Sequence, residues 1–224
     1  MTSYCVVGTD TDVGKTHVAS LLLDFLQGQG MAPGYLKLVS CGGEEEAPDC
    51  QVCQRENGLA ADKVQAIYHF SLAASPHLAA EQQGQRVSAG RLADCLRQAM
   101  SLHDPLVVEG AGGLLVPLNR DLLLADFLAG QDLPLIIVAR SGLGTINHTL
   151  LTVEAARKRG LPICGLIFSD EQGYGPDDLL VVDNMATIEA LTGVAVLGRL
   201  ARHDNLAEAR RDFHPLGQRL LSQG

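Results

Sequence analysis

The sequence predicts an α/β fold, in which a doubly wound, mostly parallel β-sheet carries helices on both faces. Apolar segments of strand length alternate along the chain with amphipathic segments of helix length. Most strand segments are continuously apolar, which is typical of parallel strands buried on both faces. A glycine-rich loop joins the first strand to the first helix. The 224 residues, 46% of them hydrophobic, suit a single domain spanning 1–224 with a well-buried core.

The individual elements follow from apolar periodicity and from glycines at helix ends. Strands are expected at 4–7, 35–39, 106–109, 135–139, 163–168 and 194–197. Helices are expected at 15–27, 88–102, 145–159 and 177–191. The polar segment after Arg202 is expected to be helical as well. Residues 42–48, with three consecutive glutamates, are expected to form a solvated loop, although such a loop can also flank a site.

The loop at 8–16 reads Gly-Thr-Asp-Thr-Asp-Val-Gly-Lys-Thr and follows the first strand directly. Glycines let backbone N–H groups turn toward phosphate oxygens, and the next helix adds its positive end. Lys15 can reach the terminal phosphates, and Thr16 can hold Mg²⁺. Five residues rather than four separate Gly8 from Gly14, so the loop departs from a strict Walker A pattern. A phosphate-binding loop (P-loop) is favoured over an ordinary turn, because a turn does not explain Lys15 and Thr16.

Two charged residues stand within or at the end of apolar strands. Glu109 ends the strand at 106–109, and ligands of open α/β sheets bind beyond the carboxyl ends of strands. Glu109 is therefore expected near the P-loop, where Mg²⁺ needs carboxylate oxygens, and the alternative is an acid that simply ends a strand. Lys37 lies inside the strand at 35–39, where an unpaired ammonium would be costly to bury. It is expected to be paired or to face a phosphoryl group, with a snorkelling surface lysine as the alternative.

Composition narrows the class of protein. The formal net charge is −9 and no basic stripe occurs, so no nucleic-acid partner is expected. No apolar run reaches the length of a membrane span and the N-terminal residues do not resemble a signal peptide, so a cytoplasmic protein with no membrane partner is expected. The cysteines are expected to be reduced, buried thiols. Cys50 and Cys53 form a lone C-x-x-C, for which packed helix thiols are favoured over a zinc or redox site.

The combined motifs resemble those of the dethiobiotin synthetase family, ATP-dependent enzymes that close the ureido ring in biotin synthesis. The resemblance runs from Gly8 to about Gly198. Its motifs are the loop at 8–16, Gly34-Tyr35-x-Lys37, Ser75-Pro76-His77, Val-Glu-Gly-Ala-Gly-Gly at 108–113, and Gly-Thr-Ile-Asn-His at 144–148. The last of these opens a predicted helix, whose N-terminus can hold a carboxylate, whereas His148 alone is more typical of a packed or capping residue.

The resemblance implies a reaction. The substrates would be 7,8-diaminopelargonic acid, CO₂ and a nucleoside triphosphate, namely ATP with Mg²⁺. One amine becomes a carbamate, and a carbamate oxygen attacks the γ-phosphate to give a mixed anhydride. The second amine then closes the ring and phosphate leaves, so the products are dethiobiotin, ADP and phosphate. A homodimer is also implied.

The resemblance further implies roles for individual residues. Thr11, Lys15 and Lys37 would be catalytic, the two lysines by neutralising charge on the carbamate and the γ-phosphate. Thr16, Asp49 and Glu109 would hold Mg²⁺. The nucleotide would contact Asp12, Val13, Gly14, Lys15, Thr16, His17, Glu109, Gly110, Ala111, Gly112, Ser169 and Asp170. The diamine would contact Thr11, Lys37, Ser40 and Cys41 and, from the neighbouring subunit, Thr145, Ile146 and Asn147.

The chain departs from the family pattern at three points. Cys41 replaces the site serine, with Ser40 beside it. Ser169-Asp170 stands where the family has an adenine-recognising Asn-Asp pair, and Leu200-Ala201 stands where it has Ile-Pro. The last two departures fall on the base pocket, so they predict weaker selection of the nucleotide base rather than a different reaction.

The main alternative is a partitioning or positioning ATPase of the same P-loop group, acting as a switch. Such proteins carry an additional lysine early in the loop, where this chain has Thr9 and Asp10, and often a basic or amphipathic tail. A cobyrinate-type amide synthase would need a glutamine-hydrolysing domain, for which 224 residues leave no room. An inactive homologue is not favoured, because the P-loop lysine and threonine, Lys37 and Glu109 are all present.

Overall fold

The computed structural model describes residues 3–44, 46–170, 173–175 and 177–222. Its centre is a seven-stranded parallel sheet with the order β3-β2-β4-β1-β7-β8-β9. The strands are β1 (Tyr4–Gly8), β2 (Gly34–Cys41), β3 (Val64–Phe70), β4 (Leu106–Gly113), β7 (Leu135–Arg140), β8 (Ile163–Ser169) and β9 (Val196–Leu200). From β1 the chain extends the sheet first to one side and then to the other. The predicted doubly wound α/β fold is confirmed.

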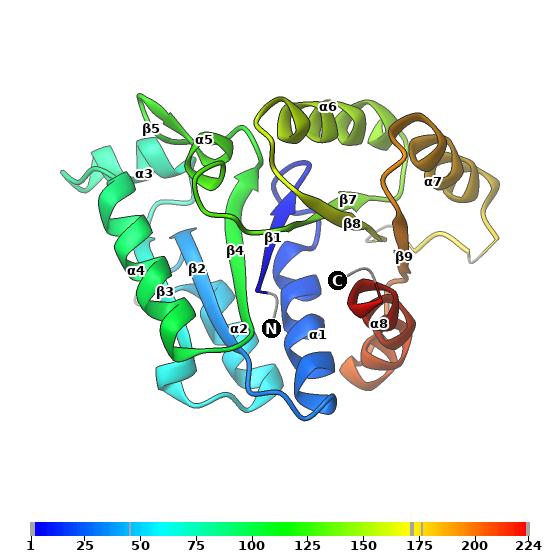
Figure 1. Ribbon diagram of the computed structural model, residues 1–224, viewed down its shortest axis with the longest axis horizontal. Coiled ribbons are helices and arrows are strands. Elements are labelled where there is room, and N and C mark those ends of the chain that lie inside the picture. Colours follow the sequence, from blue (N-terminus) through cyan, green and yellow to red (C-terminus); the bar gives the residue numbers. More distant parts are fainter. Residues whose placement is uncertain (1–2, 45, 171–172, 176, 223–224) are drawn as a thin grey trace.

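Helices cover both faces of the sheet (Figure 1). One face packs against α1 (Lys15–Gly28), α2 (Pro48–Asn57) and α8 (Leu206–Leu221). The other packs against α3 (Pro76–Gln82), α4 (Ala89–Leu102), α5 (Leu124–Leu128), α6 (Thr145–Lys158) and α7 (Leu179–Thr192). A 3₁₀ turn, Ala61–Lys63, and a small antiparallel pair, β5 (Pro117–Asn119) and β6 (Leu122–Leu123), complete the described fold. Among the described helices, none has the length and apolar character of a membrane span.

The expected helices and most expected strands occur within a few residues of their predicted bounds. The last strand is shifted, because Gly193 ends α7 in a left-handed conformation and β9 begins only at Val196. The helical expectation after Arg202 is confirmed by α8. Edge strand β3 was not predicted, because polar residues interrupt its apolar pattern. Helix α2 was also missed: it is polar overall and buries only Cys53, so it has no apolar stripe.

Strand register brings distant charged residues together. Lys37 of β2 lies opposite Glu109 of β4, and Glu109 lies opposite Val6 of β1. The carboxyl ends of these three neighbouring strands therefore meet beside the loop that leads into α1. This is the edge at which open α/β sheets bind ligands.

Candidate nucleotide and substrate site

The loop between β1 and α1 has the backbone geometry of a phosphate cradle. Asp12 and Gly14 both have positive φ angles, 53° and 89°. A Cβ atom on Gly14 would lie 2.5 Å from the Ser169 hydroxyl, so only glycine fits this turn. No side chain among the described residues caps the start of α1. Its first backbone N–H groups are therefore available to phosphate oxygens, where the helix dipole also favours an anion.

Lys15 places a positive charge inside this loop. Its side chain is buried, and Nζ donates a hydrogen bond to the backbone oxygen of Asp10 at 2.9 Å. Burial and the nearby Lys37 ammonium lower the pKa of Lys15. The side chain forms no ion pair with the described residues. A bound polyphosphate would supply the counter-charge that the folded chain does not.

Lys37 is held between two carboxylates. The residue is only 4% exposed, and Nζ lies 2.5 Å from Oε1 of Glu109 and 3.1 Å from Oδ2 of Asp49. Burial alone would lower the pKa of Lys37, but the two carboxylates outweigh it and the pKa is raised. The ammonium is therefore fully charged at neutral pH. The sequence alternative of a snorkelling surface lysine is wrong.

Thr16 completes a cluster of oxygen ligands with the same two acids. Its Oγ1 lies 2.7 Å from Oδ1 of Asp49 and 3.0 Å from Oε1 of Glu109. Asp49 also accepts a hydrogen bond from Ser40, and Lys37 together with these hydrogen bonds lowers the Asp49 pKa against the opposing effect of burial. Asp49 is thus ionised at neutral pH. One hydroxyl and two carboxylates are hard oxygen donors that fit Mg²⁺.

Tyr35 supports this cluster from within the core and was not predicted as a site residue. Its hydroxyl donates a hydrogen bond to Oε2 of Glu109 at 2.7 Å, while Oε1 faces Lys37 and Thr16. Burial and the Glu109 charge raise the Tyr35 pKa well above its usual value, so the phenol remains a donor. The sequence signal that could have identified Tyr35 was its spacing from Lys37, because residues two apart in a strand lie on the same face of the sheet.

These groups surround one cleft of about 810 Å³. The predicted site residues that line it are Thr11, Asp12, Gly14, Lys15, Thr16, His17, Lys37, Cys41, Asp49, Glu109, Ala111 and Gly112. Val13, Ser40 and Gly110 belong to the same segments but do not line the cleft. Val39, Val116 and the segment 73–76 add walls that were not assigned. The cleft thus has a charged end at the P-loop and a less polar end beside Cys41.

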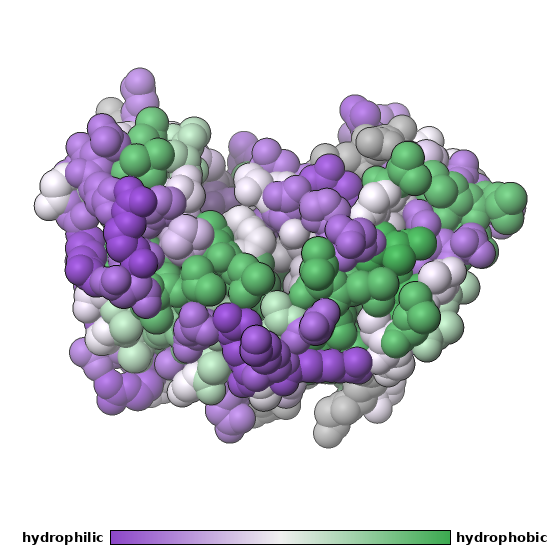
Figure 2. Space-filling view, turned by 90° about the horizontal axis from the view of Figure 1, so that it is seen from above, coloured by the Kyte–Doolittle hydropathy of each residue, from purple (hydrophilic) through white to green (hydrophobic). Residues whose placement is uncertain are grey.

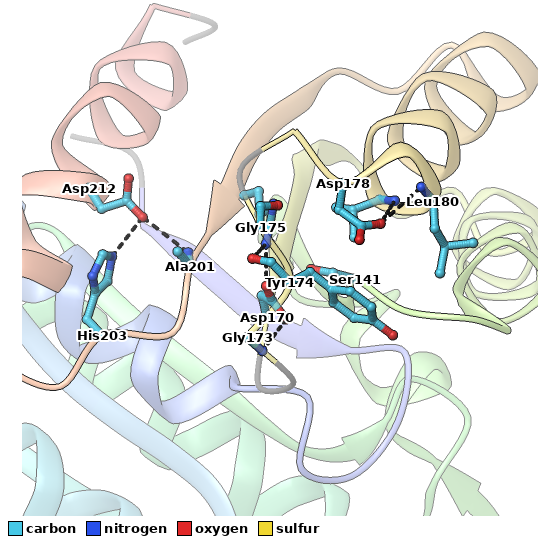
Figure 3. Close-up of polar contacts among 12 residues, drawn as sticks. Ser141, Asp170, Gly173, Tyr174, Gly175, Asp178, Leu180, Ala201, His203 and Asp212 are labelled. Carbon is cyan, nitrogen blue, oxygen red and sulfur yellow. Dashed lines mark hydrogen bonds and ion pairs between the residues drawn. The ribbon is translucent and has the colours of Figure 1, made fainter.

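Ser169, the last residue of β8, and Asp170, which follows it, do not line this cleft. They border two smaller cavities of about 420 and 250 Å³ on either side of them. The Asp170 carboxylate forms an ion pair with Arg199 of β9 and accepts a hydrogen bond from the backbone of Gly173 (Figure 3). Gly14 and His17 border the larger of the two cavities, which places it beside the P-loop.

Thr145, Ile146 and Asn147 form the first turn of α6, with Gly144 in a left-handed conformation before them. Thr145 is buried and Asn147 is exposed. Among the described residues, these three line none of the three cavities above. A role for them in this subunit's own cleft is therefore not supported, and their assignment to a neighbouring subunit's cleft stays a prediction.

The C-x-x-C pair lies on α2, directly after Asp49. Cys53 is buried and Cys50 is half-buried, and both are free thiols. Burial and the neighbouring Asp49 charge raise the pKa of Cys50 to about 12, and burial raises that of Cys53 further. The thiolate is the form that binds metals and attacks disulfides. Packed helix thiols therefore remain the better interpretation.

The fold and the cleft define a P-loop nucleotide-binding protein of the α/β class. The cell division ATPase MinD of Pyrococcus furiosus shares the fold, with a TM-score of 0.64 and 12% identity over 100% of both chains. A ParA family ATPase from Chlorobium tepidum TLS shares it with a TM-score of 0.58 and 14% identity, covering 99% of this chain and 91% of that one. At such low identity these similarities establish the fold alone.

Sequence comparison defines the family. A family model described as an AAA domain matches residues 2–210. A protein of Anaeromyxobacter dehalogenans named ATP-dependent dethiobiotin synthetase BioD is 39% identical over 214 residues, covering 94% of this chain and 95% of its own. A protein of the same name from Novosphingobium aromaticivorans is 42% identical over 200 residues, covering 89% and 88%. The chain belongs to the family of ATP-dependent dethiobiotin synthetases, which are ligases, and the resemblance carried by its motifs is confirmed.

Proposed function

We propose that this chain carboxylates 7,8-diaminopelargonic acid with CO₂ and closes the ureido ring of dethiobiotin, in a reaction that consumes ATP and needs Mg²⁺. The observation that carries the proposal is the meeting of the P-loop, two lysines and two carboxylates in one cleft of about 810 Å³. The family of the chain supports the same reaction. The products are dethiobiotin, ADP and phosphate.

Charge placement explains how the cleft would bind the triphosphate. The N–H groups at the start of α1 and the Lys15 ammonium face the phosphate oxygens. Thr16, Asp49 and Glu109 would hold Mg²⁺, which when bound neutralises charge on the same oxygens. Both acids would then serve the metal as well as Lys37. The positive charge of the Lys37 ammonium could then stabilise a reacting anion.

The reaction then needs positive charge close to the carbamate and the transferring phosphoryl group, where negative charge develops. One amine of the diamine adds to CO₂ and loses a proton, giving a carbamate. A carbamate oxygen attacks the γ-phosphorus, ADP leaves, and a mixed carbamic–phosphoric anhydride forms. The second amine attacks the carbamate carbon, which expels phosphate and closes the ring. Lys15 and Lys37 stabilise the charge on the transferring phosphoryl group and on the carbamate.

One residue of the P-loop and two at the end of β2 would position the diamine. Thr11 and Cys41 line the cleft, and Ser40 stands behind it, bonded to Asp49. Thr11 offers a hydroxyl to an amine or a carbamate, and the Cys41 thiol offers a weaker contact. Burial raises the pKa of Cys41 to about 11, so the group remains a neutral thiol at neutral pH.

A homodimer would supply the remaining substrate contacts through Thr145, Ile146 and Asn147 of the second subunit. Large apolar side chains near these residues support the pairing, because Leu143 is 85% exposed and Leu151 on α6 is 55% exposed. Figure 2 looks down on the side where α6 and α7 lie and shows hydrophobic surface in the middle of this face. Light scattering of the wild type and of Leu151→Glu tests the dimer, with a monomeric variant expected.

The reaction itself is tested directly. Purified protein is incubated with the diamine, bicarbonate, Mg²⁺ and ATP, and dethiobiotin is measured by mass spectrometry. Formation of dethiobiotin and phosphate in equal amounts, and only when the diamine is present, supports the proposal. Hydrolysis of ATP that ignores the diamine and yields no dethiobiotin would instead favour a switch-type ATPase.

A further inference from the structure

The cavity of about 420 Å³ beside the P-loop is lined in part by Arg202 and His203, which lie outside the family motifs described above. Strands β8 and β9 are parallel neighbours, with Ser169 opposite Leu200, so the residues that follow each strand lie side by side. One wall is therefore formed by Ser169 and Asp170, and another by residues 201–203. Gly14 and His17 border the same cavity. If a triphosphate binds the P-loop as proposed above, this cavity is where its nucleobase fits.

The Asp170 side chain, directly after β8, is already engaged by the protein, and Ser169 at the end of β8 lies against the P-loop. The Asp170 side chain is 1% exposed, because its carboxylate pairs with Arg199. Arg199 also donates hydrogen bonds to the backbone oxygens of Tyr174 and Gly175, which ties the segment after β8 to β9. The Ser169 side chain packs against Gly14, since a Cβ atom there would meet both its Oγ and its Cβ within 3 Å. The Asp170 carboxylate is therefore committed to Arg199, and the short Ser169 hydroxyl, which borders the cavity, offers the edge of a base a single polar group.

His203 is held in place differently. Its Nε2 lies 3.0 Å from Oδ2 of Asp212, and the same Oδ2 accepts a hydrogen bond from the backbone N–H of Ala201 at 3.1 Å (Figure 3). On its other side, Nδ1 lies 3.8 Å from Oε2 of Glu208. Asp212 and Glu208 both belong to α8, so this helix fixes the ring and the segment before it. The His203 side chain is 20% exposed and lines the cavity.

We propose that His203 is the main base-binding residue of the nucleobase pocket, and that it holds the base by ring stacking rather than by hydrogen bonds to the base edge. Asp212 acts as a positioning residue, because it fixes the imidazole and the backbone of Ala201 together. Every nucleobase offers an aromatic face, so stacking tolerates different bases. Strong discrimination needs polar groups that a wrong base would leave unpaired, and the walls described above offer few.

The experiment measures binding with and without a base. Isothermal titration gives dissociation constants for ATP, GTP, CTP, UTP and inorganic tripolyphosphate, each with Mg²⁺. For the wild type, the four nucleotides are expected to fall within about tenfold of one another, a difference of about 1.4 kcal/mol. His203→Ala is expected to weaken all four by about tenfold while tripolyphosphate binding stays unchanged. His203→Phe, which keeps an aromatic ring, is expected to restore most of the loss.

Controls separate the base contact from other effects. Asp212→Asn is expected to weaken nucleotide binding part of the way and to leave tripolyphosphate binding unchanged, whereas damage to the P-loop would weaken both. His214→Ala removes a different histidine, one on α8 that packs on Phe25 and does not line the cavity, so nucleotide binding should not change. Thermal melting of each variant shows that it is folded.

Three results would overturn the proposal. One is an ATP preference of several hundredfold in the wild type, and another is unchanged nucleotide binding in His203→Ala. The third is failure of His203→Phe to recover binding, because the ring would then act by hydrogen bonding. Loss of the proposed ligase reaction would not produce any of these patterns. An enzyme that binds nucleotides as expected but makes no dethiobiotin would reject the proposed function alone.

Discussion

The two ends of the nucleotide site are built on different principles. At the phosphate end, the buried Lys37 and Glu109 and the half-buried Asp49 and Thr16 form one network of hydrogen bonds and ion pairs. At the base end, the buried ion pair of Asp170 and Arg199 holds protein segments together. A substitution of Lys37 at the phosphate end therefore leaves the Glu109 charge buried without its partner. A substitution of His203, which lines the cavity at the base end, removes only a contact with the bound base. The phosphate end should control the rate, and the base end should adjust affinity.

Removal of the proposed Mg²⁺ should have the largest effect, because the phosphate end would then lack the divalent cation that neutralises the phosphate oxygens. We expect EDTA to abolish dethiobiotin formation and Mg²⁺ to restore it, since the proposed ligands are hard oxygens. Asp49→Asn should raise the Mg²⁺ concentration needed for half-maximal rate. The measurement is the rate of product formation against free Mg²⁺.

The thiols beside the metal ligands provide the control for this prediction. Cys50→Ser should show the same Mg²⁺ dependence as the wild type, because the neutral thiol does not bind the metal. Activity restored by zinc alone, and lost again in Cys50→Ser, would show that the C-x-x-C pair holds the functional metal.

Lys15→Ala should have the next largest effect. It removes a charge-assisted contact to the phosphates in a cleft shielded from water, so kcat should fall by about 100- to 1000-fold and nucleotide binding should weaken. Steady-state kinetics and titration calorimetry measure the two quantities. Lys158→Ala, at the exposed end of α6, makes the same charge change far from the cleft and should behave like the wild type. Wild-type turnover in Lys15→Ala would contradict the assignment of a P-loop.

Lys37→Gln should lower kcat by about 100-fold, more than it weakens ATP binding, because the charge that Lys37 answers develops in the transition state. It should also lower the free energy of unfolding by about 3 kcal/mol, since Glu109 is fully buried and loses its cation. Kinetics are therefore read beside a urea titration of the same variant. A loss of ATP affinity with unchanged kcat would mean that Lys37 binds the ground state only.

The contrast between the two ends also explains what the sequence could and could not predict. Lys37 and Glu109 stood out because charged residues are unusual in buried strands, and the P-loop is a contiguous motif. Asp49 was assigned only through the family resemblance, because α2 is polar and gave no helical pattern. The bond from Tyr35 to Glu109 joins two residues that are 74 positions apart in the sequence, so no local signal reports it.

At the base end the missing information was three-dimensional. Ser169 and Ala201 were identified as departures from the family, but what replaces their contacts was not predicted. His203 and Asp212 meet only because the chain turns from β9 into α8, and Asp170 meets Arg199 only across the neighbouring strands β8 and β9. Such pairings depend on how elements pack rather than on spacing along the chain. The sequence therefore predicted the chemistry carried by contiguous motifs better than the contacts that depend on how elements pack.

Cys41→Ser should have the smallest effect, although the residue lines the same cleft as the P-loop. The thiol is neutral at neutral pH, because burial raises its pKa to about 11, and it makes only weak hydrogen bonds. A serine hydroxyl of similar shape bonds more strongly, which is worth about 1 kcal/mol. We therefore expect the KM for the diamine to fall by less than tenfold, with kcat and the KM for ATP unchanged. A change in kcat of more than tenfold would show that Cys41 contacts the reacting atoms, and the boundary between rate-controlling and affinity-adjusting residues would then run through the cleft itself.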